Sequence, residues 1–528
     1  MRRGNSNARL DHMVSVQRPA AARRARVGAS AALVVALAVV LTACGARIAP
    51  YLGADAGTGQ GGAGNNSALS ANGGATSGGG SAGGQVTGSR SGTAQSSTRS
   101  GAGAAGAGPA AAAGGGGAPP TPQGFNFDPH AEAAACPGGA GNTASDTGVT
   151  PTQISIGNVS GLTGPLANSF NQGTEGVGAL FAAINAAGGI CGRQLKLVAE
   201  DDQQNASTNA SDVADLVGRV LAFAGSTSDG DNGGVPNMVQ AGSPDFGFAI
   251  NCNRSESATY WSASGGSCFQ PQGPGQGPYY INDSGLALAK SAGYFPTKMA
   301  FLAYNIAISA QAAQQFEYVY QHSFGGTPCY TDFAISPASA SLESDVAQMQ
   351  ANGCNGVATT LDVTGNAKLL QAMQQQSYTT PYTYTTFDGY TPSQISLAGQ
   401  SAAQGLTIGV PFIPLNESNP IVHLYLQELA TYEPGKQPSG FGFLSWHSAQ
   451  MLVYALIASG HAPTRASVTH VVSSLQNWTG GGALGPYTPN THSVGACQVD
   501  VVVKGNDFVR KAPASGLFCS SHMVQASP

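Results

Sequence analysis

The sequence places hydroxyl side chains where a helix is expected to begin. Ser226, Thr227 and Ser228 follow a short apolar segment with strand character, residues 220–224, and precede a weakly helical segment that extends to Gln240. The first backbone N–H groups of a helix have no partner within it, and the helix dipole places partial positive charge there. Together with hydroxyls, these groups suit an anion such as a carboxylate. The same residues could cap a helix that binds no ligand, so both interpretations stay open.

Residue patterns that would support catalysis are weak. No HExxH motif and no GxxxxGK[ST] phosphate loop occur. The GxSxG sequence at 79–83 lies in a Gly-rich segment that can build no nucleophile elbow. Asp201 and Asp202 are adjacent in an expected strand, so their side chains point to opposite faces. Five histidines are isolated from one another along the chain: His322, His423, His447, His461 and His470. We therefore expect no enzyme and no cofactor.

The elements that must position the hydroxyl loop are organised around residues 154–202. An apolar strand at 154–159 runs into a Gly- and Pro-containing loop, and a helix with apolar residues at helical spacing follows from Gln172. Gly188 and Gly189 end that helix, and a second strand follows at 194–198. This order predicts a βαβ unit, and ligands of open α/β sheets bind at the carboxyl ends of the strands.

This stretch also resembles a known family. The loop Thr-Gly-Pro-Leu-Ala at 163–167, the helix ending Ile-Asn-x-x-Gly-Gly-Ile at 184–190 and the strand ending Asp201-Asp202 are similar to the start of the branched-chain amino acid-binding proteins. These are type I periplasmic binding proteins that deliver solutes to ABC transporters. The resemblance runs from about residue 149 to about 519. It implies an α/β fold of two Rossmann-like lobes with parallel sheets, joined by a hinge.

The resemblance gives the first lobe a ligand-binding role. The Ser-rich loop of that family holds the ligand's α-carboxylate, which implies this role for Ser226 and Thr227. The end of the next strand also contributes there, and the matching position is Asn251, where the family usually has Thr.

From the second lobe the family places an acidic residue against the ligand's ammonium group, and the match is Asp388. The aromatic wall is shifted to Tyr304, and a further contact loop matches residues 362–364 without the family's Tyr. Phe170, after the Gly-Pro turn, is expected to close the top of the site or to pack in the core. A pocket of this composition could hold an amino acid, an amide, a short-chain polyol or an aromatic acid.

The chain beyond the first unit alternates strands and helices, which favours parallel sheets with helices on both faces. About 370 residues are too many for one core. We assign residues 134–293 and 412–484 to an N-terminal lobe, and residues 294–411 and 485–528 to a C-terminal lobe. A helix is expected at 281–292.

The N-terminus indicates export. Arg18, Arg23, Arg24 and Arg26 precede an apolar run at 27–41 that is too short to span a bilayer comfortably. The run ends in Leu-Thr-Ala-Cys, which resembles a lipoprotein lipobox, so residues 1–44 are expected to be a signal peptide whose Cys44 carries lipid. An uncleaved anchor helix is the alternative, and twin-arginine export is a further possibility. Residues 45–133 are rich in Gly, Ala and Ser and are expected to be a disordered tether.

Eight cysteines remain after Cys44, and an even number outside the cytoplasm predicts disulfides. Short loops close most easily, so we predict pairing between neighbours. No CxxC pair occurs, which argues against zinc. The predicted pairs are Cys136–Cys191, Cys252–Cys268, Cys329–Cys354 and Cys497–Cys519.

The sequence has 528 residues and a formal net charge of −5, which argues against a nucleic-acid partner. We expect a monomeric, extracytoplasmic lipoprotein that traps a small polar ligand by hinge closure and presents it to an ABC permease. A ligand sensor of the same fold and a surface lipoprotein with a degenerate pocket are the alternatives.

Overall fold

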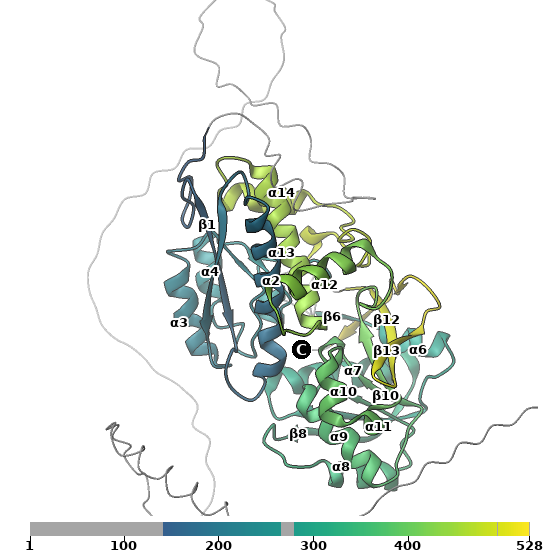
Figure 1. Ribbon diagram of the computed structural model, residues 1–528. Helices are drawn as coiled ribbons and strands as arrows, with labels where there is room; N and C mark the ends of the chain where they lie inside the picture. The colour runs from purple at the N-terminus through teal and green to yellow at the C-terminus, as the bar shows by residue number, and fades with distance from the viewer. Residues whose placement is uncertain (1–140, 266–278, 494, 527–528) are drawn as a thin grey trace, which may run out of the picture. The chain divides into compact units, whose positions relative to one another are not determined.

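A computed structural model describes residues 141–265, 279–493 and 495–526 of the chain (Figure 1). All of them belong to one compact unit. The predicted signal peptide with its lipidated Cys44, the predicted tether at 45–133, and Cys136 and Cys268 as disulfide partners lie outside the described residues.

The first sheet contains five parallel strands in the order β2-β1-β3-β4-β5. Side chains alternate along β1: Ile154 and Ile156 pack in the main core with Val177 of α2, whereas Val159 packs with Val213 of α3. Figure 1 shows α3 and α4 on one face of this sheet and α2 on the other. The elements are β1 (Gln153–Ser160), α2 (Ala167–Ala186), β2 (Gln194–Asp201), α3 (Ala206–Leu216), β3 (Ala222–Ala224), α4 (Val235–Ala241), β4 (Asp245–Phe246), α5 (Cys252–Ser255) and β5 (Tyr260–Trp261).

The second sheet has the order β13-β12-β11-β10-β9-β7-β8, and β14 pairs with β12. Strands β7 to β11 pair in parallel, and β12 adds an antiparallel edge next to β11. The elements up to that edge are β7 (Lys298–Tyr304), α7 (Ala307–Phe324), β8 (Thr327–Ile335), α8 (Glu343–Ala351), β9 (Gly356–Thr359), α9 (Val363–Gln375), β10 (Tyr382–Thr385), η1 (Phe387–Gly389), α10 (Pro392–Ala398), α11 (Gln400–Ala403) and β11 (Leu406–Val410).

The chain then leaves the second sheet and returns to the first. Helices α12 (Pro420–Tyr432) and α13 (Gly440–Ser459) pack against α2, and α14 (Arg465–Ser474) packs against α13. Within the described residues, α13 is long and apolar enough to cross a membrane, but 94% of its apolar window is buried inside the protein. It is therefore the central core helix. The chain ends with η2 (Pro489–Thr491), β12 (Cys497–Lys504), β13 (Asp507–Ala512), β14 (Phe518–Cys519) and β15 (Met523–Ala526).

The predicted end of the first helix at Gly188 and Gly189 is confirmed. Helix α2 ends at Ala186, and the following Gly188 and Gly189 have φ angles of 109° and 77°, which L-residues rarely adopt. A Cβ atom on Gly189 would lie 2.0 Å from the carbonyl oxygen of Arg193, so the turn also needs Gly for space. The side chain of Asn205 caps α3.

The helix expected at 281–292 is only partly correct. Residues Tyr279–Asn282 form β6, which pairs with β15, and the helix α6 covers Ser284–Ser291. Ile281 and Leu286 pack with Met299 and Phe301 of β7. This segment therefore packs on the second sheet, and not on the first as the boundary at residue 293 implied. The apolar pattern of 281–292 predicts one helix because a four-residue strand carries no distinct periodicity.

Two of the predicted disulfides are present among the described residues. Cys329–Cys354 joins β8 to the loop before β9, and Cys497–Cys519 joins β12 to β14. Cys191 and Cys252 are disulfide-bonded as well, and their predicted partners lie outside the described residues.

Replacing a core leucine of α13 tests its structural role. Leu452→Ala should lower the free energy of unfolding by about 2–5 kcal/mol, because Leu452 is fully buried and its removal leaves a cavity. Leu397→Ala is the matched control: Leu397 is 45% exposed, so its replacement should change stability by less than about 0.5 kcal/mol. Urea denaturation measures both. Equal effects would contradict a core position for Leu452.

Candidate functional site

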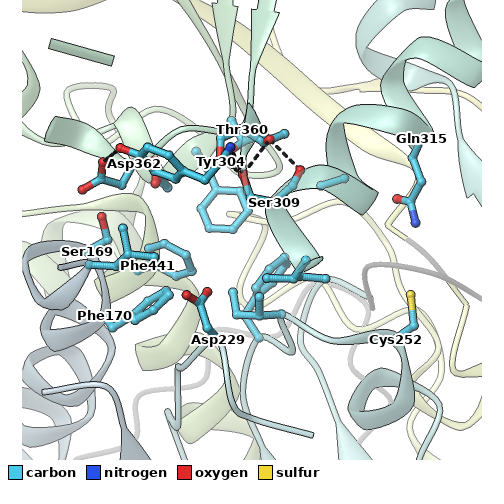
Figure 2. A pocket seen from close by; sticks show the side chains of 18 residues that line it. Ser169, Phe170, Asp229, Cys252, Tyr304, Ser309, Gln315, Thr360, Asp362 and Phe441 are labelled. Carbon is cyan, nitrogen blue, oxygen red and sulfur yellow. Dashed lines mark hydrogen bonds between the residues drawn. The ribbon is translucent and has the colours of Figure 1, made fainter. Parts of the chain in front are cut away.

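A cavity of about 220 Å³ is lined by residues that follow strands of both sheets (Figure 2). From the first sheet, Asp229 follows β3 and Phe248 follows β4. From the second sheet, Asp362 follows β9 and Asp388 lies in η1 directly after β10. The cavity therefore lies at the carboxyl ends of parallel strands, where α/β sheets place their ligands.

Aromatic rings form much of the cavity lining. Phe248 and Phe387 meet edge to face with ring centroids 4.7 Å apart, and Phe387 and Phe441 meet in the same way at 5.0 Å. Phe170, in the first turn of α2, lies 6.1 Å from Phe441. These rings come from both sheets and from α13, so one continuous aromatic cluster connects them. Tyr304, the last residue of β7, adds a fifth ring.

Asp362 contributes a buried carboxyl group. Its Oδ1 accepts hydrogen bonds from the Tyr304 hydroxyl at 2.5 Å and from the Gly365 backbone N–H at 2.8 Å, which caps α9. Its Oδ2 is buried and has no hydrogen-bond partner within the protein, and the residue as a whole is only 5% exposed. Gly at 365 permits this approach, because a Cβ atom there would lie 2.1 Å from the Tyr304 hydroxyl oxygen. Burial, with a further contribution from the Asp362 carboxyl group, raises the pKa of Tyr304, so its hydroxyl remains a donor.

Two further carboxyl groups line the cavity. The Oδ1 atom of Asp388 is buried without a partner, and burial, with a contribution from the nearby Asp362, raises the pKa of Asp388 well above its usual value. Burial also raises the pKa of Asp229 to about 7, with further contributions from the carboxylates of Asp231, Asp202 and Asp362. A carboxyl group in such surroundings tends to remain protonated unless a nearby cation stabilises its ionised form.

Neutral polar groups complete the lining. The Ser169 hydroxyl is buried and has no hydrogen-bond partner. The Ser309 hydroxyl donates to the Thr360 carbonyl at 3.0 Å and accepts from the Tyr304 backbone N–H at 3.0 Å (Figure 2). Ser309 is therefore held in place, whereas Ser169 is available to a ligand.

The charge balance of the cavity is one-sided. Among the described residues that line it, none is Lys, Arg or His. The first turn of α7 lies at the cavity through Ile308 and Ser309, and a helix N-terminus favours a negative charge by about 0.3–1 kcal/mol. The cavity's carboxyl groups can neutralise a cation by releasing their protons, whereas none of its described side chains can neutralise an anion. The cavity therefore favours a positively charged group over a negatively charged one.

The structure brings three of the six predicted ligand-binding residues to the cavity: Phe170, Tyr304 and Asp388. Ser226 and Thr227 are not among the lining residues. The Ser226 hydroxyl accepts from the Val159 backbone N–H at 3.1 Å. The Thr227 backbone N–H donates to the Ser160 hydroxyl at 3.0 Å. Both residues are buried and hold the end of β1 against the loop that follows β3.

Asn251, the sixth predicted residue, also lies outside the lining and supports it from behind. Its amide Nδ2 donates to the Asp229 carbonyl at 2.8 Å and to Asp231 Oδ1 at 2.7 Å. Asn251 thus fixes the loop that carries the Asp229 carboxyl group.

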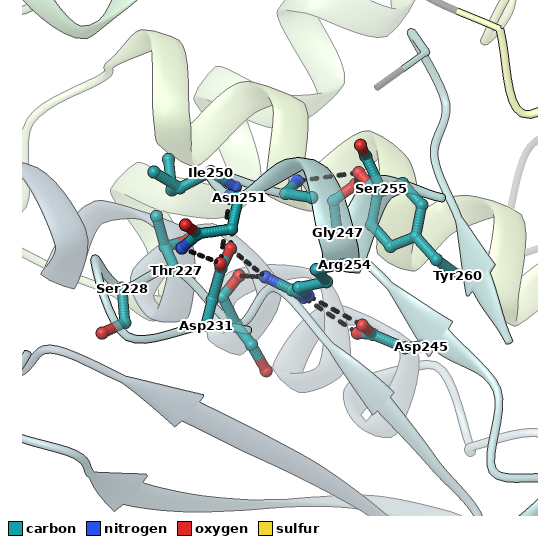
Figure 3. Close-up of polar contacts among 12 residues, drawn as sticks. Thr227, Ser228, Asp231, Asp245, Gly247, Ile250, Asn251, Arg254, Ser255 and Tyr260 are labelled. Carbon is teal, nitrogen blue, oxygen red and sulfur yellow. Dashed lines mark hydrogen bonds and ion pairs between the residues drawn. The ribbon is translucent and has the colours of Figure 1, made fainter. Parts of the chain in front are cut away.

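A buried guanidinium organises these loops (Figure 3). Arg254 donates two hydrogen bonds to Asp245, at 2.8 and 2.9 Å, and one each to Asp231 and to the Ser226 carbonyl, at 3.1 and 2.9 Å. All three charged side chains are at most 2% exposed. The group ties the loop after β3 to the loop after β4 and so sets the first-sheet wall of the cavity.

Several lining residues were not selected from the sequence. Asp229 lies in the same loop as Ser226, three residues further on, and its strand-end position could have indicated it. Phe248 and Phe387 also follow strands directly. Phe441 had no such signal, because it belongs to the long apolar α13 and reaches the cavity only after the chain has crossed back to the first sheet.

Comparison with known proteins identifies the family. The sequence profile of the periplasmic binding protein family matches residues 153–506, so the chain belongs to this family of solute-binding proteins. No curated protein sequence matches the chain.

Solved structures share the fold at low sequence identity. LivJ from Streptococcus pneumoniae, a branched-chain amino acid transporter substrate-binding protein in complex with isoleucine, aligns with a TM-score of 0.55 at 14% identity over 71% of this chain and 100% of LivJ. A fatty acid ABC transporter substrate-binding protein from Thermomonospora curvata gives 0.56 at 14% identity, over 71% and 95% of the two chains. A solute-binding protein from R. palustris in complex with 4-hydroxybenzoate gives 0.55 at 15% identity, over 70% and 98%.

Removing the buried guanidinium tests its structural importance. Arg254→Met should lower the free energy of unfolding by about 3–5 kcal/mol, because it leaves Asp231 and Asp245 buried without a counter-charge. Lys436→Met is the control: Lys436 pairs with Glu175 on the surface, where ion pairs contribute about 0–1 kcal/mol. Chemical denaturation distinguishes the two. A loss below 1 kcal/mol for Arg254→Met would show that the loops do not depend on it.

Proposed function

We propose that this protein captures a small ligand in the cavity described above and delivers it to an ABC permease, as a lipid-anchored protein on the outer side of the cell membrane. The ligand carries an ammonium group, as an amino acid or a related amine does. The observation that carries the proposal is a cavity lined from both sheets by aromatic rings and carboxyl groups, without a basic side chain among its described lining residues.

Closure of the protein around its ligand is supported by the fact that both sheets contribute residues to the cavity. Phe170 and Asp229 belong to the first sheet's connections, whereas Tyr304, Asp362 and Asp388 belong to the second. A ligand that contacts the residues of both sheets stabilises the closed state, in which the two groups of residues are close together. A ligand shifts the equilibrium between the open and closed states only through contacts that differ between them. Hinge closure of two lobes around a ligand is the usual form of this change.

Support for an ammonium-bearing ligand comes from the lining itself. The similar solved structures are described with isoleucine, fatty acids or 4-hydroxybenzoate, so the fold does not select one ligand class. The unpartnered oxygens of Asp362 and Asp388 accept hydrogen bonds from an ammonium group. Rings such as Phe248 and Phe441 accommodate an aliphatic side chain next to it.

A thermal-shift screen of the purified full chain tests ligand capture. We expect at least one compound among amino acids, amines, amides, polyols and carboxylic acids to stabilise it, by about 2.7 kcal/mol at 100 times its dissociation constant. Ala312→Phe should abolish the effect, because Ala312 lines the cavity and the larger ring fills it. Ala214→Phe, at an exposed position of α3, should leave the effect intact. A flat response across the panel, on folded protein, would contradict ligand capture.

The stabilising compound then tests delivery. Cells that lack the protein should take up the radiolabelled compound more slowly than cells that contain it. Unchanged uptake, together with retained binding, would contradict delivery to a permease and favour a sensor.

Replacing Cys44 tests the lipid anchor. Cys44→Ala should move the protein from the membrane fraction to the soluble fraction and abolish incorporation of a labelled fatty acid, because the thiol is the attachment point. Gly45→Ala, which keeps the thiol, should remain labelled and membrane-bound. Membrane association of Cys44→Ala would instead indicate that the apolar run at 27–41 stays as an uncleaved anchor.

A further inference from the structure

The cavity has three carboxyl groups on two sides and an aromatic cluster beside them. Asp229 is supplied by the first sheet, and Asp362 and Asp388 by the second. In Figure 2 the Asp229 carboxyl group lies near Phe170, and Asp362 lies on the opposite side of the cavity, next to Tyr304. A ligand thus meets a carboxyl group at both walls.

We propose that the cavity selects organic cations that carry no carboxylate, amines whose ammonium groups are their only charges, over amino acids. This inference rests on the proposed function and narrows its ligand class. The first support is the position of Asp229. Its loop is the one that contains Ser226, whose hydroxyl is already bonded to the backbone of β1 and is not among the lining residues. A ligand carboxylate placed against this wall would meet the Asp229 carboxyl instead of a hydroxyl.

The second support is the absence of a counter-charge for an anion. The described lining contains no basic side chain, and the charge of the buried Arg254 behind the first-sheet wall is neutralised by Asp245 and Asp231. An amino acid would bring a carboxylate into a cavity that already holds three carboxyl groups. An amine brings only the positive charge that these groups lack.

The third support comes from buried polar atoms that have no hydrogen-bond partner. The Asp362 Oδ2 and Ser169 hydroxyl oxygens are buried, line the cavity and have no partner within the protein. Both atoms accept hydrogen bonds from ammonium N–H groups. The faces of Phe170, Phe248 and Phe441 suit alkyl chains and cationic heads alike, because ring faces carry partial negative charge.

Compounds that differ by one carboxylate test the proposal directly. Isothermal titration of the purified full chain compares leucine with 3-methylbutylamine and lysine with 1,5-diaminopentane; in each pair the amine lacks only the carboxylate. We expect the better amine to bind at least tenfold more tightly than its amino acid, and 4-methylpentanoate, which lacks the amino group, to bind more weakly than either.

The outcomes separate this inference from the proposed function. An amino acid that binds as tightly as its amine, or an acid that binds best, would overturn the inference and leave solute capture intact. Binding of a polyol or amide alone would do the same. No binding by any compound of the wider panel would overturn both.

Isosteric neutral variants locate the interaction. Asp362→Asn should weaken amine binding at least tenfold while keeping α9 capped, because Asn is as good an N-cap as Asp. Asp229→Asn should weaken the diamine more than the monoamine, since a second ammonium group needs the opposite wall. Asp215→Asn, at an exposed position of α3, is the control and should change nothing. Unchanged amine binding in both cavity variants would overturn the proposal.

The pH dependence gives a second readout. The titratable side chains that line the cavity are Asp229, Tyr304, Asp362 and Asp388, and the charged groups just behind Asp229 are Asp202, Asp231 and the latter's partner Arg254. A bound cation favours ionised carboxylates, so binding releases protons from groups whose pKa is raised in the empty cavity.

Amine affinity should therefore rise with pH from 5 to about 7, where Asp229 becomes ionised, while an alkylammonium with a pKa near 10.4 keeps its charge. Affinity that is flat or falls over this range would overturn the proposal.

Discussion

The arrangement of the first-sheet wall depends on one buried guanidinium. Arg254 neutralises Asp231 and Asp245 and donates to a backbone carbonyl in the loop after β3. Burying three charges is costly unless each is paired and hydrogen-bonded, and here the geometry satisfies both conditions. Because β3 and β4 are only three and two residues long, their own ladders give the following loops little support. The ion group supplies that support and thereby determines where Asp229 and Phe248 face the cavity.

Much of the fold could be predicted because local chemistry and tertiary structure agree. The βαβ unit and the helix stop at Gly188 and Gly189 follow from periodicity and turn residues. Segment 279–291 could not be assigned correctly, because its place is decided by pairing with β15, more than 200 residues away.

The site was less predictable, because the hydroxyl of a Ser at the end of a strand can form a hydrogen bond with a ligand or with the protein backbone. In the structure Ser226 binds the backbone. Its hydroxyl accepts a hydrogen bond from the Val159 N–H, which lies past the two residues of β1 that pair with β3. Phe441 was hidden for a different reason. Helix α13 is buried on nearly all sides, so periodicity gave no face that could be assigned to a cavity. Residues placed directly after strands, such as Asp388, were easier to identify because sheet geometry fixes their location.

The same helix has a consequence for how an exported chain reaches its compartment. A segment as long and apolar as α13 can be retained in the bilayer during translocation instead of passing through it. Ser445, His447 and Gln450 interrupt its apolar surface, and each has a buried side-chain atom without a hydrogen-bond partner in the folded protein. These groups cost stability, and burial lowers the pKa of His447 to about 3, so it stays neutral. Their polarity makes insertion of this segment into the hydrocarbon layer less favourable. The core of the folded protein is therefore less apolar than packing alone would allow, and this favours passage of the chain across the membrane.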